Sequence, residues 1–180
     1  MLIKENDCLL LIIDLQEKLL RHIHNQSFLI NKSEVLIKTF NKLRLPIIVT
    51  EQYPKGLGKT DPRILSSIDE YSLIEKTSFS CAKDAKFTEQ FKSFNKSQII
   101  ICGIETHICI LQSAFDLLSK GYSLFIVSDA VGSRHINDTV SAIERMNKRN
   151  INLVTTEMVI FELLGNSKND HFKYLSGLVK

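Results

Sequence analysis

The sequence lacks the features that mark several large classes of protein. No apolar run approaches the roughly 18 residues of a membrane-spanning helix, so no transmembrane segment is expected. The first residues, MLIKENDC, lack the charged, apolar and small-residue segments of a signal peptide. The formal net charge is only +3, without a Lys/Arg block or a basic-aromatic stripe. We therefore expect a cytoplasmic protein that acts on a small molecule and binds neither nucleic acid nor membrane.

The four cysteines follow no disulfide or metal-binding pattern. Cys8, Cys81, Cys102 and Cys109 form neither a disulfide framework nor a C-x-x-C pair. Such a chain is typical of the cytosol, where thiols stay reduced. Cys8 and Cys102 lie within apolar runs that resemble strands, so both are expected in the core.

Apolar runs that alternate with helical patterns predict an α/β fold. Strands are expected at residues 8–13, 47–50, 73–76, 99–102, 123–128 and 152–155, and helices at 33–44, 84–94, 138–149 and 157–164 as well as after residue 103. Continuous apolar strands indicate burial on both faces, and their alternation with helices favours a parallel sheet with helices on both sides. Since no repeat, low-complexity tract or linker is present, residues 1–180 are expected to form a single domain.

The stretch IIICGIETHICILQSAFDLL at residues 99–118 places a cysteine where a strand gives way to a helix. The apolar run stops at Gly103, and the residues after it follow a helical spacing. Cys109 therefore falls in the first helical turn, where the N–H groups favour a thiolate. This position predicts a reactive nucleophile of depressed pKa; the alternative is one more buried core cysteine.

Two other strands end in charged side chains. Asp14 follows the first apolar run, and Lys76 ends the short strand near residue 73. Because the carboxyl ends of parallel strands meet at one edge, Asp14, Lys76 and Cys109 are expected to converge. A carboxylate can take the thiol proton, and an ammonium stabilises both the thiolate and the carboxylate. Together they predict cysteine-dependent hydrolysis. The alternative is that both residues are structural, with Asp14 capping a turn and Lys76 exposed to solvent.

Several strings carry a resemblance to a known superfamily. TEQYPKGLG at 50–58, EKTSFS at 75–80, GIETHICILQSAFDLL at 103–118 and VSDAVGSR at 127–134 resemble the isochorismatase-like cysteine hydrolases, and among them the isochorismatase domain-containing branch. The resemblance implies a three-layer α/β/α fold with a six-stranded parallel sheet in the order 3-2-1-4-5-6. It also implies homo-oligomers.

The same resemblance assigns roles to particular residues. It implies a catalytic triad of Asp14, Lys76 and Cys109 that hydrolyses its substrate through a thioester. It further implies a non-proline cis peptide between Ile104 and Glu105, with the N–H groups of Glu105 and Cys109 as oxyanion donors.

The loop after the second strand departs from metal-using members of the superfamily. Metal-dependent nicotinamidases carry an Asp-x-His pair there, whereas this chain reads Thr50-Glu-Gln-Tyr-Pro, and no histidine follows until His107. A transition-metal site in such a loop ordinarily needs imidazole ligands. No metal and no other cofactor are therefore expected.

Residues near the predicted triad suggest a substrate pocket. Gln16 is expected to orient a substrate carbonyl or amide, and Tyr53, Leu57 and Phe79 to form an apolar wall. We thus predict a metal-independent hydrolase of a small amide, imide or carbamoyl-type substrate. Two alternatives remain open: a catalytically idle protein that keeps the fold, and a thiol-redox protein, for which no resolving cysteine is evident near Cys109.

Overall fold

The computed structural model describes residues 1–180, which form one parallel sheet between two layers of helices. The six strands lie in the order β3-β2-β1-β4-β5-β6, as the resemblance implied. Their bounds are β1 Cys8–Ile13, β2 Ile47–Gln52, β3 Ser72–Lys76, β4 Gln98–Ile104, β5 Ser123–Gly132 and β6 Asn152–Val154. All neighbouring strands are parallel. The predicted fold class is confirmed.

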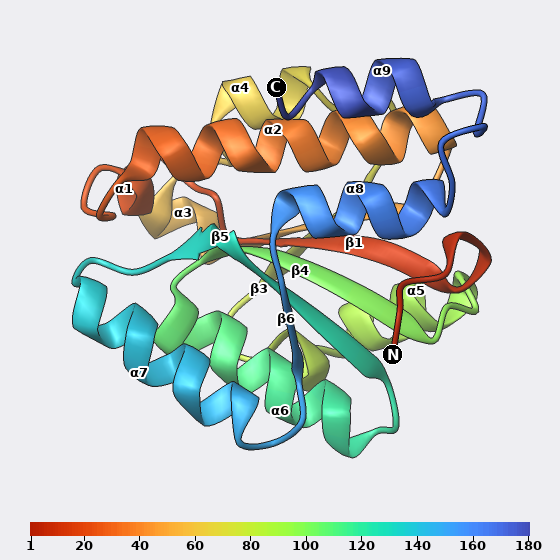
Figure 1. Ribbon diagram of the computed structural model, residues 1–180. Coiled ribbons are helices and arrows are strands. Elements are labelled where there is room, and N and C mark those ends of the chain that lie inside the picture. The colour runs from red at the N-terminus through yellow and green to blue at the C-terminus, as the bar shows by residue number, and fades with distance from the viewer.

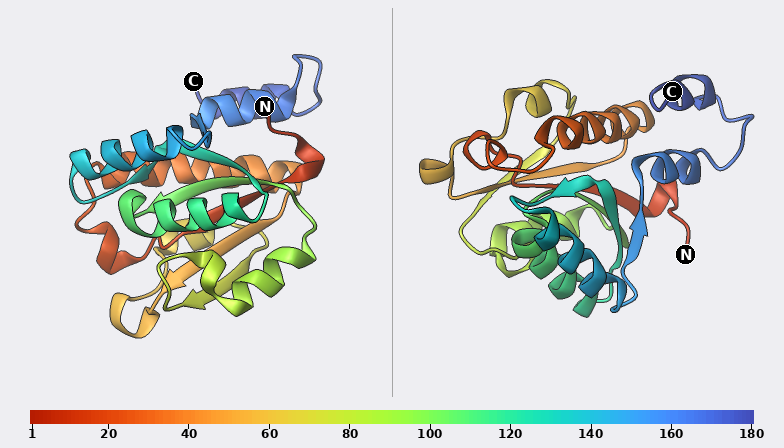
Figure 2. Two further views of the ribbon diagram at one scale, coloured as in Figure 1. Left: turned by 90° about the horizontal axis from the view of Figure 1, so that it is seen from below. Right: turned by 60° about the vertical axis from the view of Figure 1, so that its left-hand side comes forward.

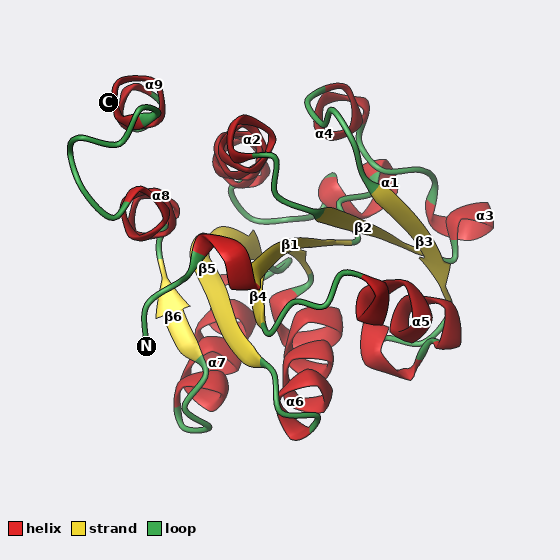
Figure 3. Cartoon of the chain, turned by 90° about the vertical axis from the view of Figure 1, so that its right-hand side faces the viewer, coloured by secondary structure: helices red, strands yellow, loops and turns green.

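Helices cover both faces of the sheet (Figures 1 and 3). One layer holds the long α2 (Gln26–Leu43) with α8 (Thr156–Leu164), and α9 (Phe172–Gly177) lies outside them. The other layer holds α5 (Ala85–Ser93), α6 (Leu111–Ser119) and α7 (Ile136–Asn147). The short helices are η1 Glu5–Asp7, α1 Glu17–Leu20, α3 Pro54–Leu57, α4 Pro62–Ser66, η2 Cys81–Lys83 and η3 Thr106–Ile110. No helix combines the length and the apolar character needed to cross a membrane.

The core follows from the alternation of side chains along the central strands. In β1, Leu10 and Ile12 pack into the cluster beneath α2, whereas Leu9, Leu11 and Ile13 pack into the cluster beneath α6. Successive side chains of a strand point to opposite faces, so a strand that is apolar at every position needs cover on both. The buried run Cys8–Ile13 is therefore the centre of the sheet.

Several element bounds differ from those expected. β2 continues to Gln52 and β5 to Gly132, and α2 begins at Gln26 rather than at residue 33. The segment between β2 and β3, expected to be a loop, contains α3 and α4, each with a proline in its first turn. Proline is compatible with the first turn of a helix because the missing N–H has no helical acceptor there. Proline and glycine content alone therefore underestimates the short helices of this segment.

The backbones of β1 and β4 lie close together at their carboxyl ends. Gly103 pairs with Ile13 and has φ +122°, and a Cβ built at Gly103 would lie 2.1 Å from the Ile13 carbonyl oxygen. Only glycine fits such an approach without displacing a strand. The chain runs from β1 outward to β3, then resumes on the other side of β1 with β4 (Figure 2). Ligands of open α/β sheets bind beside this reversal of strand order, at the carboxyl edge.

Candidate active site

The three expected catalytic residues all lie at the carboxyl edge of the sheet. Asp14 is the first residue after β1 and has a left-handed backbone, with φ 54°. Lys76 is the last residue of β3. Cys109 lies in η3, a π-helical turn that continues into α6. The helix therefore begins as expected, but its first turn is wider than an α-helical one.

Asp14 and Lys76 form a fully buried ion pair. The Lys76 Nζ lies 2.7 Å from Asp14 Oδ2, and both side chains are 0% exposed. The other carboxylate oxygen, Oδ1, accepts a hydrogen bond of 2.7 Å from Thr50 Oγ1. An ion pair withdrawn from water is costly unless additional hydrogen bonds satisfy both partners, and here they do.

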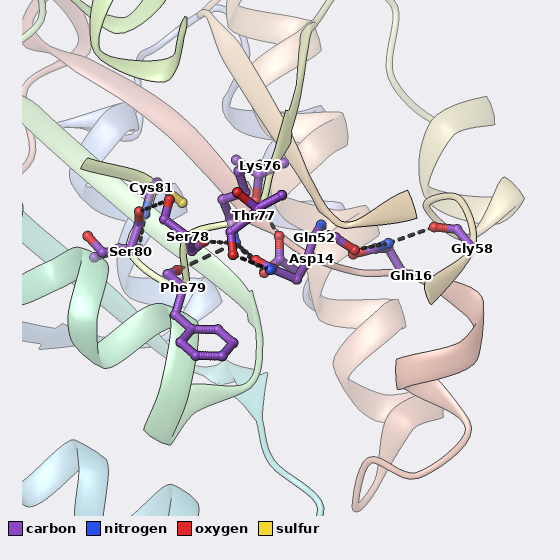
Figure 4. Close-up of polar contacts among 12 residues, drawn as sticks. Asp14, Gln16, Gln52, Gly58, Lys76, Thr77, Ser78, Phe79, Ser80 and Cys81 are labelled. Atoms are coloured by element: carbon purple, nitrogen blue, oxygen red, sulfur yellow. Dashed lines mark hydrogen bonds and ion pairs between the residues drawn. The ribbon is translucent and has the colours of Figure 1, made fainter. Parts of the chain in front are cut away.

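The Lys76 ammonium is surrounded by acceptors (Figure 4). Besides Asp14, its Nζ donates to Gln52 Oε1 at 2.8 Å and, at 3.4 Å each, to the carbonyls of Ser78 and Phe79. Burial is the largest single cause and lowers the pKa of Lys76, but the opposing causes, led by the charge of the Asp14 carboxylate, together outweigh it. The pKa of Lys76 consequently lies above its ordinary value, so Lys76 remains a cation.

The thiol of Cys109 is largely buried, with 7% exposure, and lies within the influence of this pair. Burial is the largest cause that raises its pKa, and the adjacent Asp14 carboxylate raises it further; Lys76 acts in the opposite direction. The pKa of Cys109 is therefore raised, which corrects the expectation of a depressed value. The helix terminus and Lys76 do not outweigh burial and Asp14, so Cys109 rests as a neutral thiol beside a carboxylate.

The backbone before Cys109 carries the cis peptide that the resemblance implied. It lies between Ile104 and Glu105. The Glu105 N–H has no acceptor within the chain, whereas the Glu105 carbonyl accepts hydrogen bonds from Ile108 and Ile110. The Glu105 side chain turns to Arg134, whose Nε lies 3.0 Å from Glu105 Oε2.

Gln16 is fully buried and contacts the protein backbone rather than an open pocket. Its Nε2 donates to the carbonyls of Gln52 and Gly58, at 3.0 and 2.6 Å, and its Oε1 accepts from the Gln52 N–H at 2.7 Å. Both amide protons are therefore used within the chain. This geometry is that of a cross-link between β2 and the following loop, and it corrects the expectation that Gln16 orients a substrate.

The three apolar residues expected to line the pocket differ in their surroundings. Tyr53 and Phe79 are about half exposed, at 54% and 53%, and Leu57 is half-buried in α3. A hollow of about 510 Å³ between α3 and α5 is lined by Tyr53 and Lys76 but includes neither Leu57 nor Phe79. In Figure 4 the Phe79 ring points away from the polar contacts of Lys76. Tyr53 thus lies beside the site, and the roles of Leu57 and Phe79 stay predictions.

Three polar residues beside the triad were not expected from the sequence. Thr50 and Gln52 lie two residues apart on β2, so both face the same side, toward Asp14 and Lys76. Cys81, which follows the TSFS string, is fully buried; its N–H donates to Ser113 Oγ at 2.9 Å, and burial raises the pKa of its thiol to about 11. The alternation along β2 was a usable signal for Thr50 and Gln52, whereas the position of Cys81 depends on how the loop folds back.

Other polar residues near this edge have structural partners. Asp129 Oδ1 accepts from the N–H and the hydroxyl of Thr156, at 2.8 and 3.0 Å, at the start of α8. Asp129 therefore has a structural role at the start of α8, whereas Arg134 pairs with Glu105. His107 Nδ1 lies 2.9 Å from Ser133 Oγ. No three His, Cys, Asp or Glu side chains are grouped so that they could hold a metal ion.

The sheet order and the polar groups at its carboxyl edge fit the isochorismatase-like class of hydrolases. The model of the family described as "Isochorismatase domain" matches residues 8–158, and the chain belongs to this family. It is 40% identical to isochorismatase family protein 1A of Dictyostelium discoideum over 172 residues, which cover 93% of this chain and 84% of that protein.

Solved structures show the same likeness. A structure described as MAR1 ribonuclease from Caenorhabditis elegans matches with a TM-score of 0.94 and 36% identity, covering 99% of this chain and 92% of that one. An octameric hydrolase of unknown specificity from Escherichia coli matches with a TM-score of 0.93 and 25% identity, covering 99% and 89%. The superfamily resemblance drawn from the sequence is confirmed.

Proposed function

We propose that the protein is a metal-independent cysteine hydrolase of a small amide, imide or carbamoyl-type substrate. The observation that carries this proposal is the buried Asp14–Lys76 ion pair beside the Cys109 thiol. A thiol that rests neutral needs a base at the moment of attack, and the adjacent carboxylate can serve as one. The ammonium pairs with that carboxylate and stabilises the negative charge that develops as the thiolate forms.

The first half of the proposed reaction forms a thioester. Cys109 Sγ attacks the substrate carbonyl carbon while its proton passes to Asp14. The negative charge that develops on the carbonyl oxygen is bound by the N–H groups of Glu105 and Cys109. The carbon–nitrogen bond then breaks, and the proton held by Asp14 passes to the leaving nitrogen. The acyl group remains on Cys109.

The second half reverses these roles with water. Asp14 takes a proton from a water molecule, whose oxygen attacks the thioester carbon. The carbon–sulfur bond breaks, the sulfur recovers a proton, and the carboxylic or carbamic acid leaves. Because Asp14 ends each half in its original ionised state, one carboxylate suffices as base and acid.

A panel of small amides and imides incubated with the wild type and with Cys109→Ala tests the proposal. We expect turnover by the wild type that is lost in the variant. Peptide mapping after iodoacetamide treatment gives a second readout, in which Cys109 should be modified before Cys8 and Cys102, both completely buried. Modification of Cys109 last, or turnover that survives in Cys109→Ala, would reject the nucleophile.

RNA is the second substrate class to test, because the Caenorhabditis elegans neighbour is described as a ribonuclease. The same variants separate the two classes. RNA cleavage that persists in Cys109→Ala would belong to a different site or to a contaminant, whereas cleavage lost in that variant would replace the amide assignment. The thiol-redox alternative would show itself as a disulfide at Cys109 after mild peroxide treatment.

We also propose that the chain forms a homo-oligomer, as the octameric Escherichia coli neighbour does. α8 buries Val159, Ile160 and Leu163 in the core but leaves Met158 and Phe161 about half exposed, at 45% and 42%. Sedimentation analysis of the wild type and of Met158→Glu tests the proposal and this contact. A monomeric wild type would contradict the oligomer. If Met158→Glu has the same oligomeric state as the wild type, the contact does not involve this face of α8.

A further inference from the structure

We propose that Gln52 is a positioning residue of the hydrolase site, whose neutral amide holds the Lys76 ammonium against Asp14. The proposal rests on the function proposed above. The side chain of Gln52 is placed between two groups, because its Oε1 accepts from Lys76 Nζ at 2.8 Å and its Nε2 donates to the Thr77 carbonyl at 2.7 Å (Figure 4). Gln52 therefore bonds the proposed catalytic lysine directly and makes no hydrogen bond with the thiol.

The sheet register explains why Gln52 reaches Lys76. The two residues are partners in the parallel ladder between β2 and β3, so their side chains extend side by side from neighbouring strands. Two residues earlier, Thr50 pairs with Ile13, next to Asp14. Alternate residues of one strand thus hold the two members of the ion pair, Thr50 the carboxylate and Gln52 the ammonium.

The backbone of Gln52 is itself fixed by Gln16. The Gln16 amide accepts from the Gln52 N–H and donates to the Gln52 carbonyl, at 2.7 and 3.0 Å. A neighbouring strand would make the same two kinds of hydrogen bond with this residue. The Gln16 side chain therefore substitutes for the peptide backbone of β1, which turns away at Asp14, and it keeps the end of β2 rigid.

The hydrogen-bond count at Lys76 indicates what Gln52 contributes. An ammonium has three donors, and only two acceptors lie closer than 3 Å, Asp14 Oδ2 and Gln52 Oε1. The carbonyls of Ser78 and Phe79 share the remaining donor at 3.4 Å. These two short bonds define where the positive charge lies, so removal of Gln52 would leave Asp14 as the one close partner.

The neutral charge of Gln52 matters as much as its hydrogen bond to Lys76. A neutral amide leaves one carboxylate opposite one ammonium. A glutamate of the same shape would place a second negative charge on Lys76 and weaken its effect on the thiol. A residue that only completes the strand end would have no influence on the ionisation of Cys109, and this difference makes the proposal testable.

The test compares the pH dependence of Cys109 alkylation in the wild type, Gln52→Glu and Gln52→Met. Iodoacetamide is the probe, and mass spectrometry of the Cys109 peptide gives the rate, so no substrate is needed. In Gln52→Glu we expect the profile to move to higher pH, with alkylation at neutral pH slowed about fourfold for each pKa unit of the shift. In Gln52→Met, which removes the partial negative charge of the amide oxygen, we expect a smaller shift to lower pH.

Gln98→Glu is the matched control. Gln98 is a buried glutamine of the same sheet, 3% exposed, and it too bridges two groups, the Lys4 N–H at 2.7 Å and the Leu2 carbonyl at 3.0 Å. It lies at the amino end of β4, away from the triad. Gln98→Glu should alter thermal stability without shifting the alkylation profile.

The outcomes separate this proposal from the function on which it rests. If wild-type Cys109 is not the preferentially alkylated thiol, the proposed function fails before any variant is compared. If the wild type behaves as expected but both folded Gln52 variants give its profile, or the shifts have the same sign, Gln52 is structural only. If Gln52→Glu does not fold, the direction of the Gln52→Met shift decides alone.

Discussion

Replacement of Asp14 by asparagine should change the ionisation of the Cys109 thiol and the rate of hydrolysis in opposite directions. The carboxylate raises the pKa of Cys109 through its charge and as a hydrogen-bond acceptor. Asp14→Asn keeps the size of the side chain and an oxygen that can accept from Lys76 or Thr50, but it removes the charge. The thiol should therefore ionise more readily in the variant, while the proposed hydrolysis loses its base.

The size of both effects follows from general magnitudes. A charged neighbour at this range shifts a pKa by about one to three units. Each unit raises the thiolate fraction about tenfold, but thiolate nucleophilicity falls with a Brønsted coefficient of about 0.4–0.5. Alkylation of Cys109 at neutral pH should accordingly become about 4- to 40-fold faster. Turnover should fall by about 10²- to 10⁴-fold, which is the usual contribution of a general base.

Iodoacetamide kinetics resolved by peptide mapping measure the first effect, and product formation measures the second. Asp129→Asn is the control, because Asp129 is another aspartate of the carboxyl edge, with hydrogen bonds to Thr156 and with Lys32 3.8 Å away. It should leave the alkylation rate unchanged. Slower or unchanged alkylation in folded Asp14→Asn would refute the view that the carboxylate holds the thiol in its protonated form.

Four further outcomes are expected. Lys76→Met leaves the Asp14 carboxylate buried and unpaired, so the free energy of unfolding measured with urea should fall by about 3–5 kcal/mol; a smaller loss would mean that water reaches the pair. Gly103→Ala places a methyl group 2.1 Å from the Ile13 carbonyl oxygen, so circular dichroism should show an unfolded or poorly folded protein. A variant with the wild-type melting temperature would contradict this close packing of the two strands. Activity on any substrate found should survive EDTA, and elemental analysis that finds one transition metal per chain, lost together with activity, would contradict the metal-free assignment. Burial raises the pKa of the Cys102 thiol from 9.0 to about 12. The stability that the neutral thiol contributes is therefore complete below pH 9 and is lost as the pH rises toward 12. The difference in the free energy of unfolding between the wild type and Cys102→Ala should narrow across this range.

The sequence predicts the fold well where burial determines it. Cys8–Ile13 is apolar at every position, and only a central strand with cover on both faces satisfies such a run. The bounds are predicted least well where polar residues continue a strand. Glu51 and Gln52 read as the start of a loop, yet β2 includes both, and their polar side chains find partners within the protein.

The candidate site shows the same division. Strand ends predict that Asp14 and Lys76 are close, and the structure places them 2.7 Å apart. The ionisation of Cys109 could not be predicted from the strand–helix junction, because it depends on burial and on the neighbouring carboxylate, neither of which is a local property. Gln16 illustrates the same limit, since its partners Gln52 and Gly58 lie far along the chain.

The buried ion pair and the neutral thiol together suggest how the site avoids unwanted reactivity. A permanent thiolate would react with oxidants and electrophiles whether or not a substrate is bound. Here the carboxylate that raises the pKa of Cys109 is also the proposed acceptor of its proton, so nucleophile and base become active in one step. The Lys76 ammonium makes this arrangement possible, because it pairs with the Asp14 carboxylate in a place that water does not reach. The hydrogen bonds that fix this cation, those of Gln52 above all, therefore bear on reactivity as directly as on the fold.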